Sequence, residues 1–433
     1  MNKGKKFFYG WWVVFVITIL FITASASPFA VVLKQLMTQF KVGRGEVSLS
    51  QSITNLATGF TGIFVGRSLY RHNPKKFILF GTVLTGITSF LLSASNTLWV
   101  FYVFSLLAGI SGSFCNAIAI FSLLSKWFVR KWGLAIGIVL AGGGVGSIII
   151  QPLVGIIDQN FSWRATYLFA GLLVLSINVP LILFTLKDSP ESMGLTADDD
   201  KSPPVVNVLN SRKIAQSLSR STQRAEKIQT FSYLKSSRLW LMGISFALVS
   251  IGYSAVTSQE VSLITDMRVS ATIAASARGI TLGIGAVSAL ASGWLADRLI
   301  SRYVVILFFL LTVGGMLVLL QAGTMSKIWL FVAIYGFGTG AFGTLLPIVT
   351  KDIFGVRDFT SIFGFALVLL FAGNAIGAPL AGFMYDATGS YQSVFMIITA
   401  INVIAIIGIY FAYGIDPKPL LRLPASKNGN AQT

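Results

Sequence analysis

The segment Ala271–Gly293, ATIAASARGITLGIGAVSALASG, contains one arginine among small and aliphatic residues. Placing a guanidinium deep in a lipid bilayer costs at least about 2.5–3.5 kcal/mol, so a compensating partner is expected. At helical spacing, Arg278 shares its face with alanine, threonine, glycine and serine, whereas Ile273 and Ile280 lie on the opposite face. We therefore expect Arg278 to face protein or a cavity rather than lipid.

Three roles for this arginine remain open from the sequence. Its side chain could extend along the helix to the membrane surface, or it could form a structural ion pair with Glu260 or Asp266. It could instead bind the carboxylate of a substrate, because a planar guanidinium matches two carboxylate oxygens. The substrate role is favoured because no acidic residue falls deep in a predicted span, and Glu260 lies near the outer end of its span.

The composition predicts the elements that must position Arg278. Of the 433 residues, 54% are hydrophobic and only 11% are charged, against about 25% charged in soluble domains. A helix needs about 20 apolar residues to cross a bilayer. The sequence therefore predicts an all-α membrane protein with twelve transmembrane helices in two six-helix bundles related by a parallel repeat. The predicted spans are 10–33, 47–69, 76–95, 98–124, 131–157, 165–186, 239–261, 270–296, 303–323, 327–350, 360–384 and 392–413.

The basic residues predict the orientation of these spans. Most of the 33 lysines and arginines fall in the terminal segments and in the loops on the same side of the membrane. Such loops stay in the cytoplasm, so we expect a multi-pass protein of the cell (plasma) membrane with both termini cytoplasmic. The net charge of +18 then reflects topology and attraction to membrane lipid, not nucleic-acid binding.

The scarcity of reactive residues argues against catalysis. The chain has a single histidine, His72, in a predicted loop, and a single cysteine, Cys115. A disulfide framework, a metal centre and a catalytic triad all need more such residues than this chain has. We expect no enzyme activity, no metal and no cofactor.

The two halves of the chain repeat one another. GRSLYR follows the second predicted span and GWLADR follows the eighth, while KWFVR and KDIFGVR follow the fourth and tenth at nearly the same spacing. The expected domains are an amino-terminal bundle (1–186), a cytoplasmic linker (187–238), a carboxyl-terminal bundle (239–413) and a cytoplasmic tail (414–433). Two bundles in parallel repeat are expected to hold a substrate between them near the middle of the membrane.

GWLADR resembles the loop signature of the major facilitator superfamily, in which a carboxylate caps a neighbouring helix and an arginine pairs across the loop. The first copy keeps the glycine and the arginine but has Tyr70 in place of the aspartate. The residues of this gating-loop motif are Gly66, Arg71, Gly293, Asp297 and Arg298.

Further segments resemble the branch of monocarboxylate transporters and oxalate:formate antiporters: YGWWVV (9–14), SKWFVRKWGLAIGIVLAGGGVG (125–146), DSPESMGL (188–195) and GAPLAGFMYDATGSY (377–391). In that branch an arginine of the eighth helix binds the substrate carboxylate, and Arg278 is the matching residue. The chain has Ala274 where animal members have an acid, and it lacks the lysine of their first helix. It also lacks the second deep cation of the oxalate antiporter, and a dianion beside one buried cation keeps an uncompensated charge.

The resemblance implies a secondary active transporter that moves a small monocarboxylate by alternating access together with a proton, with Glu260 as the possible proton site. The alternatives are an exchanger of the oxalate/formate type, an exporter of neutral or cationic small molecules, and a sensor that signals through the 187–238 loop. Further candidates for substrate binding are polar or aromatic residues at mid-span depth, which could equally hold helices together. They are Asn116, Tyr253, Tyr335, Phe365 and Asn374.

Overall fold

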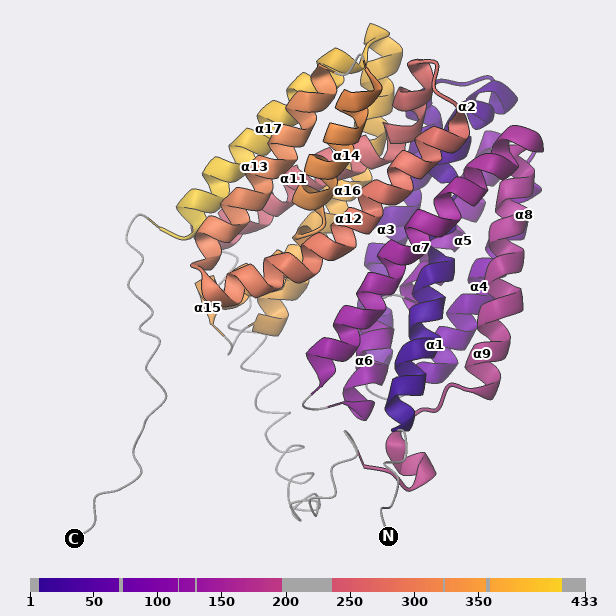
Figure 1. Cartoon of the computed structure of the whole chain (residues 1–433), viewed down its shortest axis with the longest axis vertical. Helices are drawn as coiled ribbons and strands as arrows, with labels where there is room; N and C mark the ends of the chain where they lie inside the picture. The colour runs from indigo at the N-terminus through magenta and orange to yellow at the C-terminus, as the bar shows by residue number, and fades with distance from the viewer. Residues whose placement is uncertain are drawn as a thin grey trace.

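The computed structural model describes residues 8–69, 73–115, 117–128, 131–196, 236–321, 324–355 and 359–414. Within these ranges the chain forms helices and connecting segments and no strand. Figure 1 shows the two halves of the chain as two bundles that lie side by side. The bundles correspond to the predicted fold class.

The first bundle contains six helical spans, of which the first, fourth and sixth are interrupted. Its elements are α1 (Tyr9–Ala24), α2 (Phe29–Phe40), α3 (Arg44–Leu69), α4 (Pro74–Ser93), α5 (Leu98–Phe114), α6 (Ala117–Trp127), α7 (Trp132–Asn160), α8 (Trp163–Leu173), the π-helical turn η1 (Val174–Asn178) and α9 (Val179–Phe184). The interruption between α1 and α2 was not predicted. It precedes Pro28, and proline disfavours a helical conformation in the residue before it.

The second bundle follows a short 3₁₀ helix, Pro190–Met193, and the part of the linker that lies outside the described residues. It has six spans, and only the fourth is interrupted. Its elements are α11 (Ser237–Asp266), α12 (Ala271–Arg298), α13 (Ser301–Leu320), α14 (Met325–Thr339), α15 (Phe342–Phe354), α16 (Phe359–Thr388) and α17 (Tyr391–Ala412).

Eleven helices in the described ranges are long and apolar enough to cross a membrane, and α3 is not among them. Together with α3 the described helices make up the twelve predicted spans, six in each bundle, but α3 is less apolar than the other eleven. The reason is that α3 carries polar side chains toward its neighbours. Thr54 and Thr58 donate hydrogen bonds to carbonyls of α5, and Ser52 donates to the carbonyl of Ala375 in α16. These bonds join both bundles to α3, which explains its polarity.

Small residues let α7 of the first bundle approach α12 of the second. A Cβ atom added at Gly279 would lie 2.5 Å from the carbonyl oxygen of Ser147, and one added at Gly144 would lie 2.3 Å from the Cβ of Ala286. Only glycine fits at such distances. Gly279 directly follows Arg278 in the chain, so this close contact fixes the position of the arginine between the two bundles.

Charged residues join the bundles on the membrane side opposite to the chain termini. The carboxylate of Asp386, in the last turn of α16, accepts hydrogen bonds from the backbone N–H groups of Arg44 at 3.0 Å and Gly45 at 2.8 Å. It thereby caps α3 from the other bundle. Asp266 forms ion pairs with Lys34 and with Arg44. We call Lys34, Arg44, Gly45, Asp266 and Asp386 the opposite-side clasp. Since Asp266 pairs with Lys34 and Arg44, it is not the partner of Arg278.

We expect Asp386→Ala to open this side of the protein. Losing a helix cap costs about 0.5–2 kcal/mol, which corresponds to a roughly 2- to 30-fold shift toward the open form. Ser48 is fully buried and contacts Gln259 of the other bundle. The substitution Ser48→Cys, made together with Cys115→Ser so that no other thiol reacts, places a thiol at this contact. Maleimide should label this thiol faster after Asp386→Ala.

The control for this labelling experiment is Asp188→Ala. Asp188 accepts a hydrogen bond from Asn73 within the first bundle, so its loss leaves the clasp intact. Labelling at the engineered thiol should then stay at the parent rate. An unchanged rate after Asp386→Ala would show that the cap does not hold the bundles together.

Candidate functional site

Arg278 lines a cavity of about 210 Å³ between the two bundles. The cavity receives side chains from the α1–α2 break, α3, α11, α12 and α16. Its lining residues are Ser27, Phe29, Gln51, Asn55, Tyr253, Ser254, Thr257, Ser258, Arg278 and Asn374. We call it the Arg278 pocket; all the other lining residues are uncharged.

The break between α1 and α2 forms one wall of the pocket and is held by α7. The side-chain amide of Gln151 donates to the carbonyls of Ser25, at 2.8 Å, and Ser27, at 3.4 Å. The hydroxyl of Ser25 donates to the carbonyl of Gly143 at 2.9 Å. Because α2 begins at Phe29, its N-terminus lies at the pocket. The first N–H groups of a helix lack intrahelical acceptors and carry partial positive charge, which favours an anion there.

The side chain of Arg278 is 12% exposed, and its guanidinium keeps part of its hydrogen-bonding capacity. Nη1 donates to the backbone carbonyl of Thr257. Nη1 also lies 3.9 Å from the Oε2 atom of Glu260, at the outer limit for an ion pair. Nε is buried and has no hydrogen-bond partner among the described residues. The pocket therefore presents a cation that is only partly compensated.

Glu260 is buried next to Arg278 and is not exposed to solvent at the end of a helix. Its side chain is 1% exposed, and its Oε1 atom accepts a 2.7 Å hydrogen bond from Thr281. Its Oε2 atom has no hydrogen-bond partner within the described ranges. This position corrects the expectation that no carboxylate lies deep near Arg278. The expectation failed because α11 continues to Asp266 and turns Glu260 toward α12.

Two other predicted residues lie in the same cavity as Arg278. Tyr253 comes from α11 and Asn374 from α16, and both line the Arg278 pocket. The backbone carbonyl of Asn374 accepts hydrogen bonds from Ser254 and from Asn55. Asn374 thus joins α16 to both bundles and also lines the pocket.

Tyr335 and Phe365, which were also predicted to bind substrate, do not line the pocket. Tyr335 is fully buried and stacks on Phe331, with ring centroids 5.0 Å apart. Its hydroxyl has no hydrogen-bond partner in the part of the chain that the structure describes. Phe365 packs against Trp240 at 5.4 Å between ring centroids, among other apolar side chains. Asn116 lies outside the described residues.

The gating-loop motif lies at the ends of α3 and α12. Gly293, Asp297 and Arg298 occupy the last turns of α12. The guanidinium of Arg298 lies 4.1 Å from the ring centroid of Trp294. Gly66 is part of α3, and Arg71 lies outside the described residues.

Sequence reasoning missed most of the uncharged polar residues of the pocket. Gln51 and Asn55 are spaced four residues apart in α3, and Ser254, Thr257 and Ser258 have similar spacing in α11. Residues three or four apart lie on one face of a helix. Polar residues at this spacing inside an apolar span are therefore the signal that could have found them.

Two bundles of apolar helices with a cavity between them are typical of a membrane transporter, and the comparisons with known proteins give the family. A family model described as the Major Facilitator Superfamily matches residues 13–350. The chain belongs to this superfamily, which confirms the resemblance of its motifs.

Two of the relatives below are named monocarboxylate transporters, and the third is an MFS-type transporter. Monocarboxylate transporter 12-B of Danio rerio is 26% identical over 406 residues, covering 90% of this chain and 84% of the relative. Monocarboxylate transporter 12 of Mus musculus is 28% identical over 335 residues, covering 74% and 68%. The uncharacterized MFS-type transporter YcxA of Bacillus subtilis is 24% identical over 366 residues, covering 81% and 82%.

A solved structure shares the fold. The bacterial homologue of the human lysosomal transporter Spinster, in an inward-facing and unoccupied conformation, superposes with a TM-score of 0.74 at 14% identity. The match covers 95% of this chain and 97% of the other.

Proposed function

We propose that this chain is a secondary active transporter that carries a small monocarboxylate together with a proton by alternating access. The observation that supports this most strongly is the position of Arg278 in a cavity between the two bundles, with its Nε–H group unpaired. A carboxylate there can take two guanidinium N–H bonds. The N-terminus of α2 at the same cavity adds a second attraction for an anion.

The pairing of Arg278 with Glu260 suggests how a proton enters with the anion. While Glu260 is ionised, it compensates part of the charge on Arg278 at 3.9 Å. When Glu260 is protonated it is neutral, so the positive charge of Arg278 is left uncompensated. The pocket then binds an anion more strongly. Charge balance in a buried site therefore couples the two ligands. The animal transporters that the chain resembles have an acid in the helix of the arginine, where this chain has Ala274. We infer that Glu260 of α11 serves in its place.

Charge also separates the proposed cargo from the alternatives. The lining of the Arg278 pocket contains one cation and no other charged residue, so a dianion such as oxalate would keep one charge uncompensated. An exporter of cationic compounds is disfavoured by the same guanidinium. We further propose that the chain lies in the plasma membrane with both termini cytoplasmic. The clasped side would then face outward, and the structure would be closed to the outside.

We expect purified protein in proteoliposomes to take up labelled lactate, and uptake to rise when the outside is more acidic than the inside. Lactamide has the same shape without the charge, so it should compete roughly 10- to 100-fold less well, since hydrogen bonds to charged groups contribute about 1.5–3 kcal/mol each. Equal competition by lactate and lactamide would refute carboxylate recognition. Lactate uptake that ignores the pH gradient would refute proton symport alone.

A further inference from the structure

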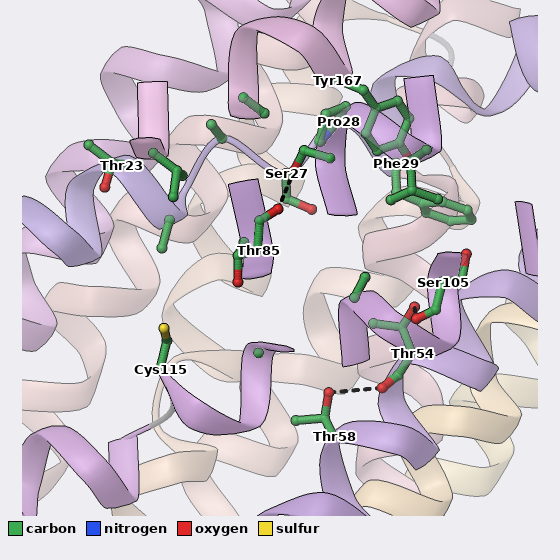
Figure 2. A pocket seen from close by; sticks show the side chains of 18 of the residues that line it. Thr23, Ser27, Pro28, Phe29, Thr54, Thr58, Thr85, Ser105, Cys115 and Tyr167 are labelled. Carbon is green, nitrogen blue, oxygen red and sulfur yellow. Dashed lines mark hydrogen bonds between the residues drawn. The ribbon is translucent and has the colours of Figure 1, made fainter. Parts of the chain in front are cut away.

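A second and larger cavity lies inside the first bundle. It has a volume of about 610 Å³ and is enclosed by α1 to α6, α8 and η1, with Phe371 of α16 at its edge. Figure 2 shows hydroxyl groups on its wall, such as those of Thr54, Thr58 and Thr85, and the rings of Phe29 and Tyr167 together on one side. No charged side chain lines it within the described residues.

The two cavities meet at the break between α1 and α2. Ser27, Phe29 and Gln51 line both the Arg278 pocket and the larger cavity. The larger cavity therefore adjoins the proposed anion site, with Phe29 at the boundary between them. A molecule whose carboxylate binds Arg278 would extend past Phe29 to enter the first bundle.

The hydroxyl groups of the larger cavity are placed to accept hydrogen bonds. Thr54 and Ser105 donate their own protons to the carbonyls of Ser50 and Phe101. Thr58 donates to the carbonyl of Thr54, as Figure 2 shows. A hydroxyl has one proton and two lone pairs. Because the protons already have acceptors on the helices, the lone pairs remain for a ligand that donates. A matching ligand carries O–H or N–H groups beside apolar surface.

The volumes indicate how large such a ligand is. Lactate has six heavy atoms, and at no more than about 30 Å³ per water-sized atom it fits within the 210 Å³ Arg278 pocket. On the same scale the larger cavity has room for about 20 further atoms. Cavities of 300–1,000 Å³ are typical of sites for drug-sized ligands. A cargo limited to three carbons would leave the larger cavity empty.

We propose that the larger cavity holds the uncharged body of a bulkier monocarboxylate, one that combines an apolar group with hydroxyl or amide donors, while its carboxylate binds Arg278. This inference rests on the proposed function. A second charge on the body is excluded because the cavity offers no counter-charge and burying an unpaired charge is costly. A suitable probe is 3-(4-hydroxyphenyl)propionate, whose phenol donates a hydrogen bond. The matched probe is 3-(4-carboxyphenyl)propionate, which has a second carboxylate in place of the phenol.

The substitution Gly112→Leu fills the cavity with little disturbance of its wall. Gly112 lines the larger cavity and not the Arg278 pocket, and a Cβ atom added there meets only the Oγ1 atom of Thr58, at 3.8 Å. The control is Gly343→Leu on an exposed face of α15, where an added Cβ has no atom within 4 Å. Both changes replace a helix glycine by leucine, which favours the helix.

The experiment measures how the two probes inhibit lactate uptake by the full-length protein in proteoliposomes. In wild type and in Gly343→Leu, the hydroxyphenyl acid should inhibit at least 10-fold more strongly than the dicarboxylate. In Gly112→Leu its inhibition should weaken at least 10-fold while lactate is still carried. Equal inhibition by both probes, or inhibition unchanged by Gly112→Leu, would overturn the inference and leave the proposed function standing.

A second measurement needs no substitution. Cys115 is the single cysteine of the chain and lines the larger cavity (Figure 2). The hydroxyphenyl acid should slow its reaction with a small methanethiosulfonate reagent several-fold, whereas lactate, confined to the Arg278 pocket, should not. Absence of protection by the hydroxyphenyl acid would overturn the inference. If neither lactate nor the probe binds in a way that depends on Arg278, the proposed function itself fails.

Discussion

Arg278→Ala should abolish carboxylate uptake, lowering the rate at least about 30-fold. Truncating one partner of a buried, hydrogen-bonded charge pair costs about 2–5 kcal/mol or more, and the cargo carboxylate would then face Glu260 without a cation. Arg278→Lys should recover only part of the rate, because an ammonium lacks the planar fork that holds two oxygens. Both variants can be measured as uptake of labelled lactate into proteoliposomes with matched protein content.

A suitable control for these variants is Arg164→Ala. Arg164 lies in the first turn of α8 and donates to the carbonyl of Ser95 and to the side chain of Asn96, within the first bundle. Its removal should leave uptake near the wild-type rate. Because Arg278→Ala leaves Glu260 without its neighbouring cation, the double variant Arg278→Ala/Glu260→Gln tests transport in a neutral site. Near-normal uptake in either variant lacking Arg278 would contradict the assignment of this residue.

The positions of the helices could be read from the sequence because each span is a local run of apolar residues. The predicted span 270–296 agrees closely with α12 (Ala271–Arg298), and the predicted span 392–413 agrees with α17 (Tyr391–Ala412). α3 shows the limit of this approach. Its polar residues reduce its hydropathy below that of its neighbours, although its hydroxyl groups bind carbonyls in both bundles. Hydropathy records the composition of a helix and not the partners that it meets.

The candidate site could be predicted only in part, for a related reason. Arg278 was identifiable because a permanent charge in an apolar span is costly whichever helices the span contacts, so it indicates a bound partner. The burial of Glu260 depends on how α11 is rotated against α12, which is a property of the packed bundle. Phe365 was predicted to bind substrate, but an aromatic residue in the middle of a span can equally pack in an apolar cluster. Its contact with Trp240 depends on the tertiary structure and cannot be read from the sequence.

Glu260→Gln should uncouple carboxylate movement from the proton. Glutamine keeps the shape of glutamate, and its amide oxygen can accept the 2.7 Å hydrogen bond that Thr281 now donates to Glu260. Arg278 would then lack a counter-charge at every pH, so the anion could bind without a proton. With 1:1 coupling, a gradient of one pH unit supports about tenfold accumulation. Wild type should approach this value, whereas Glu260→Gln should stop near equal concentrations.

Counterflow separates this loss of coupling from a loss of transport. Exchange of labelled for unlabelled lactate at equal pH needs only binding and the movement of the bundles, so it should continue in Glu260→Gln and disappear in Arg278→Ala. Glu191→Gln, on an exposed acid of the Pro190–Met193 helix, should behave as wild type in both assays. If Glu260→Gln still accumulates lactate against a gradient, the proton travels on another group or on the cargo. Glu260 would then serve only to hold Arg278 in place.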